Sequence, residues 1–464
     1  MAVLFLQSSN IKAVKQAEIT TMIEKHMDDV AIPGIAVVII SNNQKLYLDT
    51  KGVNGQGEEL SNNSPMFIGS VSKSLTALAV MQLVEDGTIQ LDEPVKKYIS
   101  YFKVAEPQLT ENIRVRDLLN QTTGLSRTKS IPSSDYDYTI KERVQALANM
   151  EAVSSRGTEF NYLNDNYNIL GLLIEEVSGL SYAEYMKDNV FKPIGMDSTT
   201  ADIEDIRDKN VHGHTNIFGF SNSIKQAVPR YDIPSGYILS NLEDMYSYLE
   251  FLIEPDESIL KKESIKIMRT AASYSNYGMG WRMENINGAQ VVEHSGAVPG
   301  FSSHLAVIPA TNSGYLYIMN KNHLIHNFVN VYNRLNGNML QVAMGENSFN
   351  YFPSIWVIRI FSLVLLILTA KDLWNTKKLL SVKNYKKEWI KEGIKSLVLI
   401  LFLTFGLSYI LKNLLGLAVD IRVMFAYVPD YTSLLVVDIL VQVIRLIISL
   451  VNIFKSEEKS AILN

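Results

Sequence analysis

The chain contains no cysteine among its 464 residues. This absence excludes disulfide bonds, thiolate zinc sites and a cysteine nucleophile. The seven histidines are scattered and lack the His-Glu-x-x-His spacing of a zinc protease, so we expect no metal and no cofactor. There is also no excess of positive charge: the formal net charge is −5, which argues against a nucleic-acid partner. Internal repeats and low-complexity linkers are absent as well.

Apolar residues make up 47% of the chain and gather in its last quarter. Before that quarter, residues 20–345 read as one mixed α/β domain. Strand-like stretches such as Ile35–Ile40 and Tyr315–Met319 alternate there with helical patterns such as Leu75–Val84 and Glu243–Ile253.

Residues 1–19 are expected to form a separate N-terminal segment. Met1–Gln7 is too short for the apolar region of a signal peptide and has no basic residue before it. One interpretation is the remnant of an export signal. The alternatives are a true start further upstream and translocation driven by a later apolar segment.

Three apolar stretches follow the domain, at residues 352–370, 396–415 and 431–454. A helix that crosses a bilayer needs ~20 apolar residues. The sequence therefore predicts three transmembrane helices, with the lipid bilayer as a partner. The alternative is three buried core helices of a soluble domain.

The placement of lysines predicts an orientation for these helices. Residues 371–395 contain eight lysines, and the positive-inside rule makes this segment a cytoplasmic loop. The tail at residues 455–464 would then be cytoplasmic too. It follows that the domain at residues 20–345 lies outside the cytoplasm, on a multi-pass protein of the cell membrane.

Two charged residues lie within these apolar stretches. Arg359 and Asp438 each follow the start of their span by seven residues, so we expect them at similar depth. Because charges inside a bilayer usually pair, one hypothesis is an Arg359–Asp438 ion pair between the first and third helices. The alternative is that each reaches water or headgroups independently.

A candidate nucleophile lies at Phe67-Ile-Gly-Ser-Val-Ser-Lys73. The apolar spacing after Lys73 predicts a helix that ends near Gly87, with Ser70 at its N-terminus and Lys73 on the same face. A partly desolvated lysine amine can take the proton of a serine hydroxyl. The Ser-x-x-Lys pattern alone is weak evidence, because Ser258–Lys261 and Ser456–Lys459 show it too.

Two later motifs add to this one. Tyr162-Leu-Asn164 precedes a helical pattern and can direct a phenol and a carboxamide into one cleft. His294-Ser295-Gly296 follows a strand pattern and precedes a turn, where the glycine would let a substrate approach the backbone. Either motif alone would be weak evidence.

Together the motifs resemble those of the serine β-lactamase and penicillin-binding protein superfamily, in its class C-like branch. Ser-x-x-Lys, Tyr-x-Asn and Lys/His-Ser/Thr-Gly occur in the family's order, and Val115–Leu125, Phe191–Met196 and Tyr277–Trp281 also match. The resemblance covers residues 20–345. It implies an α/β (α+β) β-lactamase/transpeptidase-like fold, with an antiparallel sheet flanked by helices, a helical region, and then an all-α transmembrane segment.

The resemblance also implies roles for the site residues. Ser70 would form an acyl-enzyme, while Lys73 and Tyr162 would share general acid–base catalysis. The backbone N–H groups of Ser70 and Ala297 would form the oxyanion hole. The residues expected to bind the substrate are Asn164, His294, Ser295 and Gly296.

His294 departs from the lysine that β-lactamases of this branch usually carry, which favours peptidases and esterases. The leading hypothesis is thus a membrane-anchored serine hydrolase for an extracytoplasmic peptide or amide, of the D-amino-acid peptidase or carboxypeptidase type. Membrane D-peptidases of nonribosomal peptide maturation show a similar combination of domain and helices. We expect specificity to lie in loops at Ser126–Tyr138 and Phe218–Asp232.

Alternative functions share the same motifs. They are a penicillin-binding sensor without turnover, an esterase or β-lactamase, and a transport or assembly protein whose membrane part carries the function. The sequence leaves the natural substrate and the oligomeric state open.

Overall fold

A computed structural model describes residues 2–126, 136–286, 288–323, 331–346, 349, 354–379, 386–403, 424–425 and 428–462. The chain forms two compact units. The first comprises residues 1–215 and 221–352, and the second comprises residues 216–220 and 353–464. Each unit is described separately below.

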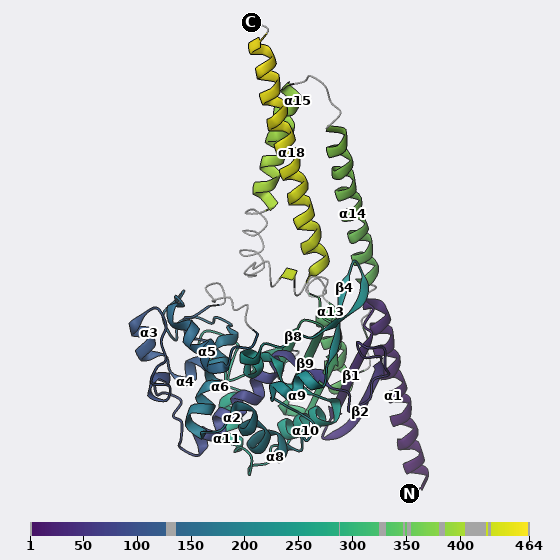
Figure 1. Ribbon diagram of the computed structural model, residues 1–464. Helices are drawn as coiled ribbons and strands as arrows, with labels where there is room; N and C mark the ends of the chain where they lie inside the picture. Colours follow the sequence, from purple (N-terminus) through teal and green to yellow (C-terminus); the bar gives the residue numbers. More distant parts are fainter. Residues whose placement is uncertain are drawn as a thin grey trace. The chain divides into compact units, whose positions relative to one another are not determined.

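A six-stranded antiparallel sheet is the centre of the first unit (Figure 1). Its strand order is β2-β1-β10-β9-β8-β7, so the first and last strands of the domain pair in the middle of the sheet. The strands are β1 (Gly34–Ser41), β2 (Gln44–Gly52), β7 (Arg282–Ile286), β8 (Ala289–Val298), β9 (Phe301–Ile308) and β10 (Ser313–Met319).

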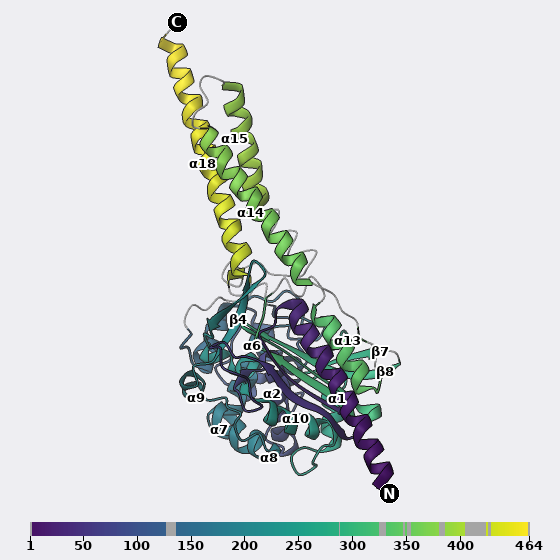
Figure 2. The same cartoon turned by 90° about the vertical axis from the view of Figure 1, so that its right-hand side faces the viewer.

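Both faces of this sheet are buried, which explains the unbroken apolar sequence of β1. Alternate side chains of a strand point to opposite faces. Ile35, Val37 and Ile39 pack in one core cluster, and the residues between them pack in the other. Helices α1 (Ala2–Val30) and α13 (Val331–Ala343) cover the first face and lie side by side (Figure 2).

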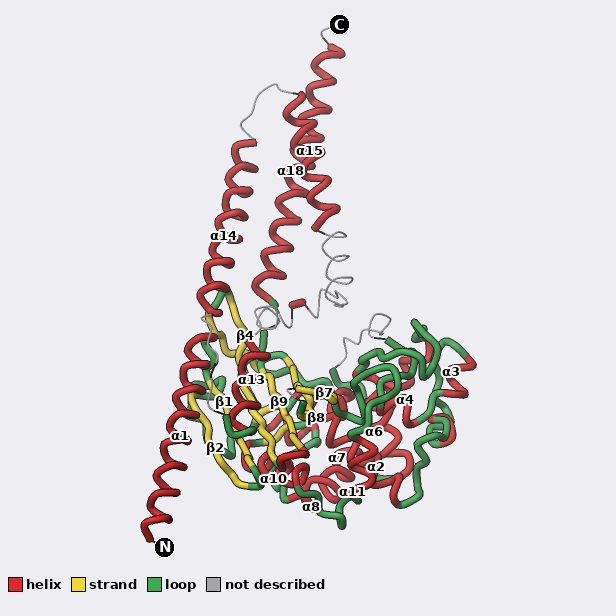
Figure 3. The backbone as a smooth tube through the Cα atoms, turned by 180° about the vertical axis from the view of Figure 1, so that it is seen from behind, coloured by secondary structure: helices red, strands yellow, loops and turns green. Residues whose placement is uncertain are grey.

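The second face carries α2 (Ser72–Glu85), α10 (Leu242–Ile253) and a helical region (Figure 3). Helix α2 is buried on every side from Ser72 to Met81, so it runs through the core rather than over it. The other α-helices that the structure describes in this unit are α3 (Pro107–Asn112), α4 (Val115–Leu119), α5 (Ile140–Ala146), α6 (Asn164–Ser178), α7 (Tyr182–Tyr185), α8 (Lys192–Ile194), α9 (Ile203–Asp208) and α11 (Lys262–Met268).

These elements confirm the predicted fold class and the individual strand and helix patterns. The expected boundary after residue 19 falls inside α1, whose buried Ile19, Met22 and Ile23 join the core. The sequence predicted a loop at Phe218–Asp232. The structure instead places strand β5 (Phe220–Lys225) in this interval, and β5 pairs with β4 (His212–Ile217). The short strands β3 (Met66–Phe67) and β6 (Leu239–Ser240) form a third, two-stranded sheet.

In its described residues the second unit contains three long helices: α14 (Ser354–Leu379), α15 (Lys386–Leu401) and α18 (Pro429–Ile462). Most of residues 371–395, the predicted cytoplasmic loop, is helical, because α14 continues to Leu379 and α15 begins at Lys386. The cytoplasmic location of this segment stays a prediction. Helix α18 continues beyond residue 454 into the expected tail. Of the predicted span 396–415, residues 404–415 lie outside the described part of the chain.

Among the described residues, one helical segment is long and apolar enough to cross a membrane, Pro429–Lys455 in α18. Length and composition alone are weak evidence, since a core helix of a soluble protein can meet the same criteria.

Helices α14 and α18 run parallel, as first and third spans must, but their register differs from the prediction. Tyr431 Oη lies 2.7 Å from Ser362 Oγ, and Thr369 Oγ1 donates to Asp438 Oδ1 at 2.9 Å. The hypothesis of an Arg359–Asp438 pair is therefore wrong. Arg359 lies ten residues before Thr369, about 15 Å along a helix, and its Nε donates to the Gly219 carbonyl at 3.2 Å.

Candidate active site

Ser70 lies in the 3₁₀ turn Gly69–Val71, which leads directly into α2. Its side chain is partly exposed, whereas Lys73, one turn later, is fully buried. The helical turn brings Lys73 Nζ to 3.0 Å from Ser70 Oγ, as the Ser-x-x-Lys spacing predicts.

Two further oxygen atoms accept hydrogen bonds from the Lys73 amine. Asn164 Oδ1, at the first residue of α6, lies 2.9 Å from Nζ, and the Ser235 carbonyl oxygen lies 2.5 Å from it. With Ser70 Oγ, they match the three N–H donors of an ammonium group. The buried amine is thus held by three neutral oxygen atoms.

Aromatic rings line the site next to Lys73. The Tyr162 ring centroid lies 4.9 Å from Lys73 Nζ, within range of a cation–π contact. The ring also packs edge-on against Tyr277 at 6.1 Å and lies 6.2 Å from the His294 ring. The structure thus brings Tyr162 and His294 together with Ser70, Lys73 and Asn164, although they come from three distant motifs.

His294 is 2% exposed and is bonded through both ring nitrogens. Nδ1 lies 2.8 Å from the Ser295 carbonyl and Nε2 lies 3.0 Å from Tyr277 Oη. Burial, with a smaller effect from the Lys73 charge, lowers the pKa of His294 to about 3. At neutral pH the ring is therefore uncharged, with Nδ1–H donating to the carbonyl and Nε2 accepting from the Tyr277 hydroxyl.

Ser295 points to the opposite face of the sheet, as the residue after His294 in strand β8 must. Its Oγ lies 2.9 Å from Nδ1 of the buried His304. His304 Nε2 in turn lies 3.2 Å from a Glu293 carboxylate oxygen. We predicted that Ser295 binds the substrate. In this structure its hydroxyl instead bonds His304 on the face of the sheet opposite to His294.

Glycines at the third motif permit close packing of the chain on itself. A methyl group at Gly296 would lie 2.1 Å from the Ile68 carbonyl oxygen, and one at Gly69, where φ is +55°, would lie 2.4 Å from the Ala297 nitrogen. Gly296 therefore makes room for the turn that carries Ser70. We predicted that this glycine would let a substrate approach the backbone, but in the structure the chain itself makes the close approach. The same packing brings the backbone of Ala297 beside the turn that carries Ser70, as an oxyanion hole requires.

Gln121 holds the backbone of the Tyr162-Leu-Asn164 motif in place. Its Oε1 accepts from the Leu163 N–H at 3.0 Å and from Asn166 Nδ2 at 2.6 Å, which holds the backbone between Tyr162 and Asn164. Gln121 itself has φ +60° and follows α4.

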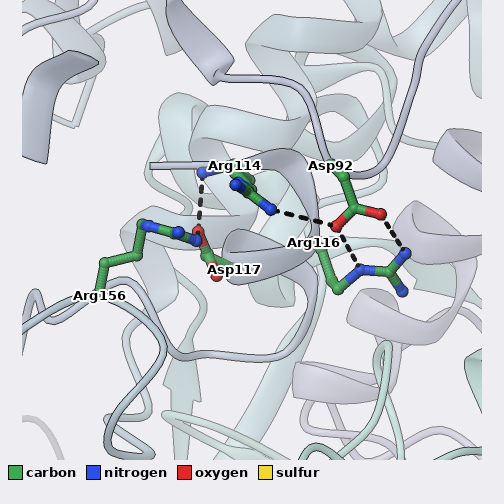
Figure 4. A network of polar contacts seen from close by, with 5 residues as sticks. All are labelled: Asp92, Arg114, Arg116, Asp117 and Arg156. Atoms are coloured by element: carbon green, nitrogen blue, oxygen red, sulfur yellow. Dashed lines mark hydrogen bonds and ion pairs between the residues drawn. The ribbon is translucent and has the colours of Figure 1, made fainter. Parts of the chain in front are cut away.

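A charge network fixes the start of α4 (Figure 4). Asp117 accepts from the Arg114 N–H at 2.8 Å and from Arg156 Nη1 at 2.9 Å. Arg116 forms a two-point ion pair with Asp92 nearby. These contacts account for the charged residues of the Val115–Leu125 stretch.

Sequence reasoning missed three residues of the site: Tyr277, Asp232 and Ser235. Tyr277 lay in a stretch that matched the family, and that stretch packs on α2: Gly280, at φ +80°, would bring a methyl group within 3.0 Å of Ser74 Cα. Neither Asp232 nor Ser235 belonged to a motif, and Asp232 entered the sequence analysis only as the end of the predicted specificity loop Phe218–Asp232.

No group of three or more His, Asp or Glu side chains in the described part of the chain is placed to hold a metal ion. The polar groups that converge on Ser70 are amine, amide, hydroxyl and backbone groups. Such groups suit proton transfer and stabilisation of an oxyanion.

Comparison with known families agrees with this geometry. The family model described as Beta-lactamase matches residues 19–334. The chain belongs to this family. Its first unit is accordingly a β-lactamase-related domain of the serine hydrolase type, with the Ser70–Lys73 pair assembled.

Three relatives illustrate the range of this beta-lactamase-family domain. Protein flp of Staphylococcus aureus strain MW2 is 28% identical over 324 residues, which are 66% of this chain and 63% of that protein. Penicillin-binding protein 4 of Amycolatopsis lactamdurans is 26% identical over 68% of this chain and 88% of its own length. The octameric penicillin-binding protein homologue from Pyrococcus abyssi has a TM-score of 0.62 and 28% identity, over 71% of this chain and 78% of that one.

Proposed function

We propose that this protein is a membrane-anchored serine hydrolase that forms an acyl-enzyme on Ser70 and acts on an extracytoplasmic peptide or amide. The observation that carries the proposal is the 3.0 Å contact between Ser70 Oγ and Lys73 Nζ, with two further oxygen atoms bonded to the amine.

The oxygen atoms of Asn164 and Ser235 determine the direction in which the lone pair of a neutral Lys73 amine points. The carbonyl oxygens of Asn164 and Ser235 can only accept, so they bind two N–H groups of Lys73 in either protonation state. A neutral amine has two N–H groups and one lone pair. With both N–H groups engaged, the lone pair faces Ser70 Oγ and can take its proton.

The reaction follows from this geometry. Ser70 Oγ attacks the substrate carbonyl while its proton passes to Lys73, and backbone N–H groups of Ser70 and Ala297 bind the oxyanion. The C–N bond breaks as the leaving amine receives a proton from Lys73 or Tyr162. Water then hydrolyses the acyl-enzyme and releases Ser70.

Two observations support a D-amino-acid peptidase or carboxypeptidase rather than a β-lactamase. The relatives include a protein named penicillin-binding protein 4 and a penicillin-binding protein homologue. In addition, the position usually occupied by a lysine in class C-like β-lactamases is the buried, neutral His294, which offers no positive charge to an antibiotic carboxylate.

Covalent labelling of the full chain in detergent tests the nucleophile. We expect a fluorophosphonate and a penicillin each to add one adduct to wild type and none to Ser70→Ala, as read by intact mass. Steady release of product from a D-alanyl peptide would distinguish an enzyme from a sensor that acylates once. No adduct with either reagent would overturn the proposal.

The side-chain pattern of the second unit supports anchoring in a membrane. Large apolar residues of α14 and α18 point outward, including Trp356, Ile360 and Ile447, each more than half exposed. Polar residues such as Ser362, Gln442 and Ser449 are instead buried. Only 22% of the Pro429–Lys455 window is buried, unlike the core helix of a soluble protein, and a lipid surround explains this arrangement.

The absence of cysteine provides a direct test of orientation. We expect Lys187→Cys, on the catalytic domain, to react with a membrane-impermeant maleimide in intact cells. Lys391→Cys, in the basic segment of α15, should react only after permeabilisation; both lysines are exposed. Labelling of both variants in intact cells would contradict the multi-pass topology.

A further inference from the structure

A carboxylate outside the three motifs lies behind the Lys73 amine. Asp232 ends the 3₁₀ turn Arg230–Asp232 and is partly exposed. Its Oδ1 accepts from Ser235 Oγ at 2.5 Å, and its Oδ2 lies 3.4 Å from Asn164 Nδ2. Asp232 therefore contacts both residues whose oxygen atoms hold Lys73.

The contact with Asn164 decides the orientation of an amide. A carboxylate can only accept, so the NH₂ end of Asn164 faces Asp232 and the oxygen end faces Lys73. If the amide were reversed, its NH₂ group would meet the amine and could not accept from it. The lone pair of neutral Lys73 would then no longer be confined to the direction of Ser70.

The contact with Ser235 holds the second acceptor. Ser235 is fully buried, and its carbonyl oxygen is the one at 2.5 Å from Lys73 Nζ. The Ser235 hydroxyl bonds the Asp232 side chain and also lies 3.2 Å from the Asp232 carbonyl oxygen. This four-residue turn, Asp232–Ser235, fixes where the Ser235 carbonyl points.

A buried ion pair anchors the carboxylate from the other side. Asn168 Nδ2 donates to Asp232 Oδ1 at 3.0 Å and lies 3.3 Å from Asp165 Oδ1. Asp165 forms a two-point pair with Arg143, with both contacts at 2.7 Å and both side chains at most 5% exposed. The position of Asp232 is thus set by groups that do not touch the reacting atoms.

We propose that Asp232 is a positioning residue for Lys73: it orients the Asn164 amide and the Ser235 carbonyl so that the amine presents its lone pair to Ser70. The inference rests on the function proposed above, because it assigns a role only if Lys73 accepts the Ser70 proton.

The electrostatics of the network agree with this role. Burial raises the pKa of Asp232, while the hydrogen bonds from Ser235 and Asn168 and the charge of Lys73 lower it. The same Coulomb attraction acts on the Lys73 amine, so removing the carboxylate should change the pH dependence of the labelling rate.

The test compares the rates at which a fluorophosphonate labels Ser70 of the full chain across pH. Asp232→Ala removes the acceptor and the charge, and a misplaced base costs ~100-fold in rate. Asp232→Asn keeps one amide oxygen as acceptor and should fall between Asp232→Ala and wild type. In both variants the rising limb of the pH–rate profile should move to lower pH.

Asp244→Asn is the matched control. Asp244 is a buried carboxylate of α10 that accepts from Thr199 Oγ1 at 2.7 Å and from the Ser198 N–H at 2.9 Å, outside the site. We expect Asp244→Asn to lower the Tm of the protein and to leave the rising limb of the pH–rate profile at its wild-type pH. A merely structural role for Asp232 would give the same pattern as this control.

The outcomes separate the two proposals. If wild type is not labelled at Ser70, the proposed function fails. If wild type is labelled, and both Asp232 variants acylate within twofold of it with an unmoved limb, the positioning role fails. Should the Asp232 variants not fold, Asn168→Ala tests the same role, because it removes one bond to Asp232 while keeping the carboxylate. We expect a slower labelling rate, and the wild-type rate would overturn the inference.

Discussion

The two units of this protein bury opposite kinds of surface, and each buries a cation in a different way. The catalytic domain has an apolar interior, and its buried Lys73 is held by the neutral oxygen atoms of Ser70, Asn164 and Ser235. The helical unit has apolar side chains outside, and its buried Arg445 pairs directly with two carboxylates, Asp372 and Glu392.

This difference shows how the groups around a buried cation suit it to a structural role or, as proposed for Lys73, to a reactive one. A guanidinium between two carboxylates keeps its charge and joins helices α14, α15 and α18. The Lys73 amine lies among neutral acceptors, and the Asp232 carboxylate lies beyond Asn164 and Ser235, an arrangement that suits the proposed role as a base. The surroundings, rather than burial itself, decide which role a cation has.

The largest expected effect comes from making Lys73 resemble Arg445. In Lys73→Arg the cation remains but cannot accept a proton, so acylation of Ser70 should slow by ~10²–10⁴-fold, the usual contribution of a general base. Lys73→Met should be equally slow. Retention of the wild-type rate in both variants, measured by fluorophosphonate labelling, would transfer the role of base to Tyr162.

The next largest effect is the pH dependence of the free energy of unfolding that the neutral His294 contributes. Its folded-state pKa of about 3 lies below the ordinary value of 6.5, so the unfolded chain binds a proton that the folded domain does not. The free energy of unfolding should therefore fall as pH drops from 6.5 towards 3, by up to a few kcal/mol. Denaturant titrations at several pH values measure this slope.

His294→Gln isolates that contribution. His26 and His214 are buried with lowered pKa values and act in the same direction, but they remain in the variant. The acid loss of stability should be smaller in His294→Gln than in wild type. An identical pH dependence would mean that His294 binds protons equally in the folded and unfolded states, so that burial does not lower its pKa.

A smaller effect is expected from removing the structural cation. Arg445→Met leaves Asp372 and Glu392 without this partner and should destabilise the helical unit by ~1.5–3 kcal/mol, as for hydrogen bonds to charged groups. Ser70 acylation in detergent should not change. Lys391→Met, on the exposed side of α15, is the control, and equal loss of helix signal in both variants on SDS titration would contradict the special role of Arg445.

The smallest effect should come from Tyr277→Phe. The change removes the donor to His294 Nε2 at 3.0 Å, and a buried acceptor left without its bond costs ~1 kcal/mol or slightly more. Tyr274→Phe, at a 65% exposed tyrosine, should be neutral. Thermal unfolding of the two variants measures the difference.

Much of this protein could be predicted from the sequence, because local chemistry specifies it. The Ser70-x-x-Lys73 spacing lies within one helical turn, so the 3.0 Å contact follows from helix geometry. The apolar run of β1 is typical of a strand buried on both faces, and the order of the three motifs identified the family and its fold.

Only the tertiary structure decided which distant residues meet. Asp232 and Ser235 are polar residues without a motif, and they reach Lys73 because the Arg230–Tyr237 segment packs on α2 and α6. The register between helices α14 and α18 could likewise not be predicted from the sequence. Equal distances from the start of two apolar stretches predicted an Arg359–Asp438 pair, but side-chain packing aligned Asp438 with Thr369 instead. Spacing along one helix is set by covalent geometry, whereas contacts between elements depend on how whole surfaces fit.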